Sequence, residues 1–170
     1  MKTTALTLIT ALALGSFASA KGKPAWAAAA KPGKQNIVEI VLADDGEFDV
    51  LQAAVIRAGL VDALSGKKQL TVFAPTDDAF IALLEAADEA AAIAAVETLE
   101  VEALTDILLY HVTKGRRISK SVLAAPKYKM LNGDKLTRAE LLDAGVAETD
   151  ISASNGIIHV IDSVLVPKAD

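Results

Sequence analysis

The stretch LTVFAP (residues 70–75), followed directly by TDDAF (76–80), joins a strand pattern to a helix start. The first six residues are largely β-branched, aromatic or apolar and end in a proline, which is typical of a strand. Thr76 then stands at the N-cap position of a helix. Asp77 and Asp78 fall in the first turn, where carboxylates satisfy free amides and favour the positive helix end. The stretch therefore predicts a strand that runs straight into a helix.

Further elements are predicted on both sides of this stretch. Residues 37–55 have apolar side chains at helical spacing, broken at Asp45-Gly46, which predicts two short helices rather than one. The alanine-rich residues 85–104 favour helix strongly. Near the C-terminus, GIIHVIDSVLVP (156–167) is apolar on both alternating faces, as expected for a strand in the middle of a sheet.

The N-terminus predicts a secreted protein. Lys2 forms a short positive region, ALTLITALAL (5–14) is an apolar run too short to span a bilayer, and Ala18-Ser19-Ala20 is a small-x-small cleavage site. We therefore expect a signal peptide over residues 1–20, cleaved after Ala20, and an extracellular or periplasmic location. Residues 21–35 carry four lysines, two prolines and no acid, which predicts a flexible basic arm.

Composition excludes several classes of function. Residues 35–170 carry 12 basic and 22 acidic side chains, a net charge of −10, which argues against nucleic acid as a partner. The chain has no cysteine, so disulfides, thiolate metal sites and thiol catalysis are excluded. Nine acids lie between Asp77 and Asp106. They form either a calcium or basic-partner surface or the solvated face of two or three helices, and the lack of EF-hand spacing favours the second.

Positive charge gathers in the next segment, where residues 114–138 hold eight basic side chains and one acid. Within KYKMLNGDKLTR (127–138), Asn132-Gly133 predicts a β-hairpin. Strand alternation places Lys127 and Lys129 on its outer face and Tyr128 and Met130 inside. The segment is either a merely solvated hairpin or a patch for an acidic polysaccharide or acidic protein, and the candidate binding residues are Arg116, Arg117, Lys127 and Lys129.

The two histidines are predicted to be structural. His111 continues a helical stripe with Leu104 and Leu108, where a leucine would be expected, and His159 lies among isoleucines. No H-x-x-x-H or H-x-H spacing suggests a metal, and no G-x-S-x-G suggests a serine hydrolase. We therefore predict no catalytic residue, no cofactor and no metal, and expect that the protein is not an enzyme.

Three segments together resemble the fasciclin domain family: TVFAPTDDAF (71–80), LLYHV (108–112) and SNGIIHVIDSVLVP (154–167). The resemblance covers residues 36–167, leaving a short tail at 168–170. It implies an α+β wedge, a seven-stranded β-sandwich with several helices packed along one edge. It also implies a single-domain secreted protein of the bacterial type.

The resemblance further implies a non-enzymatic adhesion module whose partner is a cell-surface or matrix protein or an acidic polysaccharide. We expect a monomer, peripheral to a cell surface and without a membrane span. Tyr110 and His111 match the tyrosine–histidine region that is assigned to integrin recognition in animal relatives. Asp162 falls at a second such site but is followed by serine, so an integrin partner is not carried over. The alternative function is a secreted carrier of an apolar ligand, a lipid or a pigment.

Overall fold

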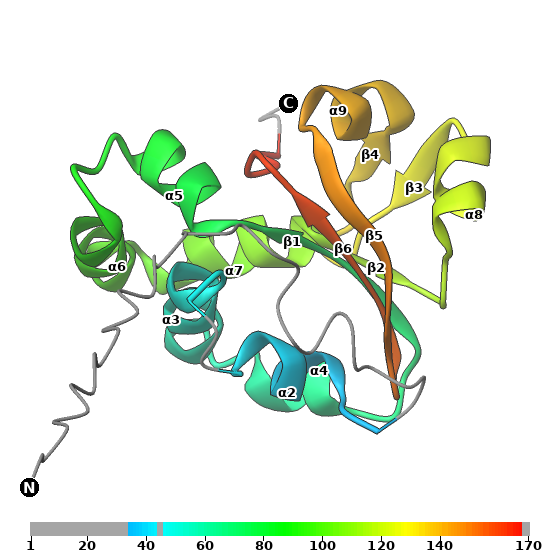
Figure 1. Ribbon diagram of the computed structural model, residues 1–170, viewed down its shortest axis with the longest axis horizontal. Coiled ribbons are helices and arrows are strands. Elements are labelled where there is room, and N and C mark those ends of the chain that lie inside the picture. Colours follow the sequence, from blue (N-terminus) through cyan, green and yellow to red (C-terminus); the bar gives the residue numbers. More distant parts are fainter. Residues whose placement is uncertain (1–33, 44–45, 168–170) are drawn as a thin grey trace, which may run out of the picture.

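Four strands form a mixed sheet in the middle of the molecule (Figure 1). The computed structural model describes residues 34–43 and 46–167. The strand order is β2-β1-β6-β5, in which β1 and β6 are parallel and the other neighbours antiparallel. A separate hairpin pairs β3 with β4. The strands are β1 (Leu70–Pro75), β2 (Val112–Lys114), β3 (Lys127–Lys129), β4 (Lys135–Thr137), β5 (Val146–Ala153) and β6 (Gly156–Ile161).

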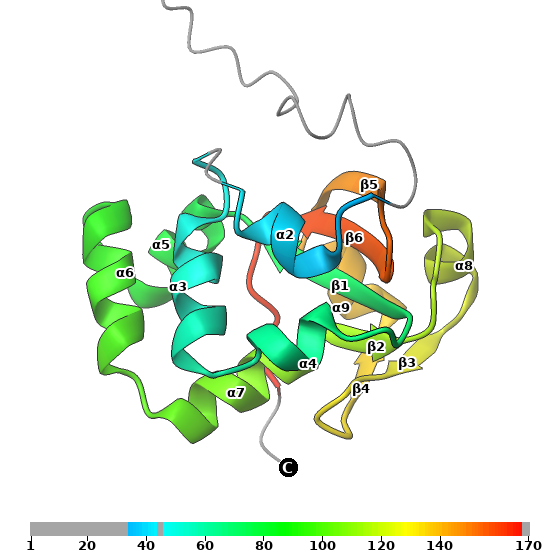
Figure 2. The ribbon, with the colours of Figure 1, turned by 90° about the horizontal axis from the view of Figure 1, so that it is seen from below.

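Helices cover both faces of this sheet. They are α2 (Ile37–Val41), α3 (Asp49–Arg57), α4 (Val61–Ser65), α5 (Asp77–Leu84), α6 (Glu89–Thr98), α7 (Val101–Tyr110), α8 (Ser119–Ala124) and α9 (Arg138–Asp143). One apolar core lies between the helices α2 through α7 and the face of the sheet that carries Val72 and Ile158. A second core joins α8, α9 and the hairpin with the face that carries Phe73 and Ile161. Figure 2 shows α3, α5 and α6 at one end of the molecule and α8 at the other.

The predicted strand at residues 70–75 is confirmed, and so is the central position of the C-terminal strand. Every residue of β1 and β6 is buried, because each strand has a neighbour on both sides and a core on both faces. However, β6 ends at Ile161 and does not continue to residue 167. The amide of Asp162 still bonds to the Gly145 carbonyl, next to the last β5–β6 pair, but the amide of Leu165 beyond it donates to a histidine ring and not to a strand.

The expected α+β class is confirmed, but the expected seven-stranded sandwich is not. The described residues contain six strands, divided between a four-stranded sheet and a two-stranded hairpin. Residues 162–167, which the apolar alternation placed in the C-terminal strand, form none, and the amide of Leu165 bonds to His111 instead. The helices also pack over both faces of the sheet rather than along one edge.

The start of α5 confirms one prediction and corrects another. Thr76 is its N-cap, with Oγ1 accepting from the amide of Ala79 at 3.4 Å. Asp77, however, points away from its own helix. Its carboxylate accepts from the amides of Asp49 and Val50, at 3.2 and 2.9 Å, and so caps α3. Sequence spacing could not reveal this bond, because the two helices are far apart along the chain.

The remaining local predictions are confirmed. Two short helices, α2 and α3, occupy residues 37–57, and the acidic run lies on α5, α6 and α7. The hairpin turns at Asn132-Gly133, where Gly133 adopts a φ of +106° that a β-carbon would strain. The predicted signal peptide and most of the predicted basic arm lie outside the described residues. Within them, no helix combines the length and the hydropathy that a bilayer crossing requires.

Candidate functional site

His111 is fully buried, and both of its ring nitrogens are used. Nδ1–H donates to the Ile107 carbonyl at 2.7 Å, since a carbonyl can only accept, and Nε2 accepts the amide proton of Leu165 at 2.8 Å. The ring is therefore neutral. Burial lowers the pKa of His111 to about 4. It connects the end of α7 to the C-terminal segment, which is a structural task.

His159 has the opposite tautomer and an equally enclosed position. Its Nε2–H donates to the Arg117 carbonyl at 2.9 Å, while Nδ1 accepts from the amide of Asp150 at 3.3 Å. The ring stacks on Phe73, with centroids 5.7 Å apart. Burial lowers the pKa of His159 as well. Neither histidine has a free nitrogen for a metal or a proton transfer.

Tyr110 is also buried, with 4% of its surface exposed. It lies in the wall of an open groove of about 330 Å³ beside α9 and residues 163–166. Burial and the nearby Glu140 carboxylate raise the pKa of Tyr110. Asp162 lies close to this groove in sequence and is exposed. Of the three residues taken from the tyrosine–histidine and aspartate regions, only Asp162 is therefore on the surface.

The two arginines of the predicted basic patch make bonds within the protein. Arg116 donates from Nη1 to the Ala153 carbonyl at 2.9 Å and from Nη2 to the Ser152 hydroxyl, both on β5. The Arg117 guanidinium lies over the Tyr128 ring, 5.5 Å from its centroid. The amide of Arg117 also donates to Thr71 Oγ1 at 2.9 Å. Both arginines thus fasten the loop after β2 to the sheet and the hairpin.

The hairpin lysines, in contrast, are directed outward as predicted. Lys127 and Lys129 are exposed, and Tyr128 between them is buried against α8, where its hydroxyl donates to the Val122 carbonyl. The hairpin register places Lys129 directly opposite Lys135, which is also exposed. We call Lys127, Lys129 and Lys135 the lysine face. Lys135 was not among the predicted site residues, because counting outward from a two-residue Asn132-Gly133 turn pairs Lys129 with Leu136, whereas the observed register pairs it with Lys135.

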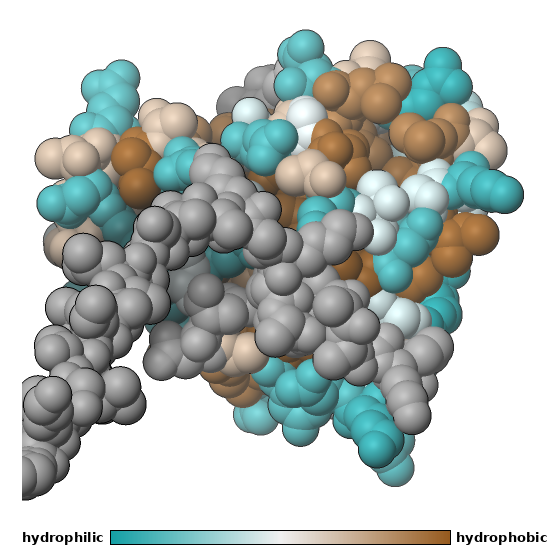
Figure 3. Space-filling model, viewed as in Figure 1, coloured by the Kyte–Doolittle hydropathy of each residue, from teal (hydrophilic) through white to brown (hydrophobic). Residues whose placement is uncertain are grey.

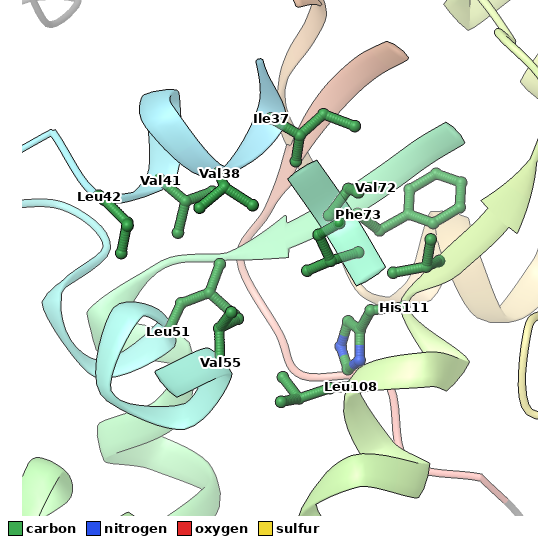
Figure 4. Close-up of a pocket in the computed structure, with 12 residues that line it drawn as sticks. Ile37, Val38, Val41, Leu42, Leu51, Val55, Val72, Phe73, Leu108 and His111 are labelled. Atoms are coloured by element: carbon green, nitrogen blue, oxygen red, sulfur yellow. The ribbon is translucent and has the colours of Figure 1, made fainter. Parts of the chain in front are cut away.

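An apolar cavity lies inside the first core, between α2, α3, α7 and the sheet. Figure 4 shows side chains of Val41, Leu51, Val55 and Val72 around it, with the His111 ring at one side. Its free volume is about 20 Å³, room for about one water molecule. Sites for lipids or pigments are typically some 300–1,000 Å³. The cavity is therefore a packing defect and not a ligand site.

One cluster of possible metal ligands exists among the described residues. Asp49, Asp77 and Glu89 have carboxylate oxygens within 4.8 Å of one another. Both oxygens of Asp77 already accept backbone amides. The cluster lies at the N-terminal ends of α3 and α6, whose positive dipole ends stabilise part of its negative charge.

The chain matches known proteins over most of its length. Residues 46–167 match the family model of the fasciclin domain. Protein sll1483 of Synechocystis is 37% identical over 145 residues, which cover 82% of this chain and 77% of that protein. Immunogenic protein MPB70 of Mycobacterium bovis is 31% identical, over 88% of this chain and 79% of its own length.

Two matches are to much longer proteins. Transforming growth factor-beta-induced protein ig-h3 of Sus scrofa is 38% identical over 76% of this chain, and the match spans only 19% of that protein. A solved FAS1 domain pair from the insect cell adhesion molecule Fasciclin I superposes with a TM-score of 0.55 at 17% identity, over 79% of this chain and 52% of the other. The fold and the sequence agree, and the chain belongs to the fasciclin domain family.

Proposed function

We propose that this protein is a secreted, non-enzymatic adhesion module that binds an acidic polysaccharide through the lysine face. An adhesion role is supported by the family and by the fold shared with a cell adhesion molecule. The single observation that carries the choice of partner is the pairing of exposed Lys129 with exposed Lys135 across the hairpin.

This pairing is unfavourable without a partner. Like charges directly opposite each other on two strands destabilise a hairpin. Lys127, two residues from Lys129 on the same strand, adds a third charge roughly 7 Å away. Anionic groups placed along this face would relieve the repulsion. Three point charges at such spacing suit a polymer that carries an anion on successive units.

The arginines point to the same class of partner. Bidentate recognition of a discrete carboxylate or phosphate needs a free guanidinium. Both Nη atoms of Arg116 bond to β5, and Arg117 is half-buried over Tyr128 with its Nε enclosed, so neither guanidinium is presented as an open fork. The ammonium groups of the lysine face bind by charge and with little directional demand. Distributed sulfate or carboxylate groups fit this better than one specific anion.

The two helices that pack against the hairpin carry exposed apolar side chains. The hairpin lies between α8 and α9 (Figure 1). On the face shown in Figure 3, hydrophobic residues reach the surface over α8 and α9, among hydrophilic ones. Leu123 of α8 and Leu142 of α9 are 44% and 54% exposed.

Two other readings have less support. A carrier of an apolar ligand is not favoured, because the internal cavity holds about one water molecule. An acidic protein surface would use the same lysines, and it is the alternative outcome of the experiment below. We also infer secretion after cleavage at Ala20, a domain that spans residues 36–167, and a monomer. N-terminal sequencing and sedimentation of the secreted protein test these inferences.

The decisive experiment is salt elution from immobilised heparin and from immobilised polygalacturonate. The double variant Lys127→Glu/Lys129→Glu should elute from both at clearly lower salt than the native chain, with a melting temperature that does not fall, since the new glutamate at position 129 would face Lys135. The matched control is Lys67→Glu/Lys68→Glu, which makes the same change in net charge at two exposed lysines before β1. The control should elute like the native chain.

Two results would contradict the proposal. Equal loss in both variants would mean that net charge alone governs retention. No retention of the native chain on either polysaccharide at low salt, together with retention on an immobilised polyglutamate chain, would assign the lysine face to an acidic protein instead.

A further inference from the structure

A second surface with a strong charge lies at the other end of the molecule, in an open groove between α3 and α6. The groove has a volume of about 690 Å³. On α6 it is lined by Glu89, Ile93 and Glu97, spaced four residues apart along one stripe. On α3 it is lined by Asp49, Gln52 and Ile56, the last 55% exposed. It therefore offers apolar contact between acidic ends.

The electrostatics of this groove call for a cation. Asp49 and Glu89 lie with Asp77 in one cluster of carboxylates. Burial and the neighbouring charges of Asp77 and Asp49 raise the pKa of Glu89, because the charged form is partly desolvated and repelled by these carboxylates. Arg57 is the one basic residue in the lining of this groove, and it donates to the Leu99 carbonyl at the far end. A basic segment with apolar neighbours would satisfy both the charge and the exposed side chain of Ile56.

The chain itself contains such a segment just before the described residues. KGKPAWAAAAKPG (residues 21–33) has three lysines, no acid, a run of alanines and Trp26, which is the only tryptophan of the protein. Lys34 extends the positive charge. The segment therefore combines basic side chains, which complement the acids of the groove, with apolar side chains, which can pack on its isoleucines.

The segment is also long enough to reach. Its exit is fixed, because the Gln35 carbonyl accepts from the amide of Ser154 at 2.7 Å. From there the path must pass α2 and α3, which are about 7.5 and 13.5 Å long at 1.5 Å per residue. The nine residues from Lys34 back to Trp26 extend to about 30 Å.

We propose that the groove between α3 and α6 binds residues 21–33 of the same chain, with lysines at the carboxylates of Asp49, Glu89 and Glu97 and Trp26 against the isoleucines. The bound segment would cover the acidic helices and leave the lysine face open. The proposal is independent of the polysaccharide partner.

The fluorescence of Trp26 tests it in the full chain. Its emission should be shifted to shorter wavelength relative to a synthetic peptide of residues 21–34, and the shift should disappear in high salt. It should also disappear in Glu89→Lys/Glu97→Lys. The matched control is Glu102→Lys/Asp106→Lys, which reverses two exposed acids at comparable positions of α7 and should keep the shift.

Three outcomes would overturn the proposal. They are an emission equal to that of the free peptide, a shift that survives reversal of Glu89 and Glu97, and a shift that grows with protein concentration. The last would mean that the groove holds the segment of a second copy. If the charge-reversed variant fails to fold, as judged by circular dichroism, Glu89→Gln/Glu97→Gln replaces it and should still reduce the shift.

Discussion

Gly156 is the position at which a single methyl group should cost most. It begins β6 and is paired with Leu70 of β1. A β-carbon at Gly156 would lie 2.0 Å from the Leu70 carbonyl oxygen and 2.7 Å from Cδ1 of Ile37. Ordinary C···O contacts are about 3.3–3.6 Å. The Gly156→Ala variant must therefore separate β1 from β6 by more than 1 Å at their first pair.

The expected loss of unfolding free energy is about 3 kcal/mol. Overpacking of a core typically costs about 1–3 kcal/mol, and here the obstacle is backbone, which cannot rotate away. The separation also weakens the bond from the Leu70 amide to the Asn155 carbonyl, 3.0 Å long, at about 1 kcal/mol. Alanine also lowers the conformational entropy of the unfolded chain, which offsets about 0.4–1 kcal/mol of this loss.

Urea unfolding followed by circular dichroism measures this loss, and the melting temperature should fall by about 10 °C. The matched control is Gly66→Ala, because the nearest atoms to its new β-carbon lie at 3.7 Å. The control should be neutral or slightly stabilising. If Gly156→Ala unfolds at the same urea concentration as the native chain, the close approach of the two strands is not what requires glycine here.

Two further predictions concern buried polar side chains. Asn155→Ala should lose about 3 kcal/mol of unfolding free energy in urea, because the amide of Ile37 and the carbonyl of Leu64 lose their partner. Asn132→Ala in the hairpin turn is the control and should lose less than about 1 kcal/mol. The pKa of His111 is about 4 in the folded chain and near 6.5 when unfolded, so the unfolded chain takes up the proton first as the pH falls. The free energy of unfolding should therefore fall by roughly 3 kcal/mol between pH 6.5 and pH 4. The variant His111→Leu should be less stable at pH 7, but its free energy of unfolding should change less with pH across this range. Urea unfolding at a series of pH values measures both.

Local features of the fold could be predicted because their causes are local. Thr76 caps the helix that it precedes, and alternation along β3 places Tyr128 inside. Both depend on residues within a few positions along the chain. The turn at Asn132-Gly133 follows in the same way from the backbone freedom of glycine.

Predictions failed where a bond joins distant parts of the chain. Asp77 caps α3 rather than its own helix, and the amide of Leu165 bonds to His111 instead of continuing a strand. Neither partner is visible from spacing. The same reason applies to the candidate site, because the partners of Arg116 and Arg117 on β5 and on the hairpin could not be inferred from the sequence. The lysines could be placed, because a strand has a fixed period.

The net charge of −10 on residues 35–170 is not an obstacle to an anionic partner, because the charges are separated in space. The acidic helices α3 and α6 lie at one end of the molecule and the hairpin at the other, in both views (Figures 1 and 2). Charges in water are screened beyond a Debye length of about 8 Å at physiological salt. A polysaccharide at the hairpin therefore meets the lysine face and little of the field of the acidic helices α3 and α6. It follows that such a partner would fix the orientation of the domain, with α3 and α6 directed away from the polymer.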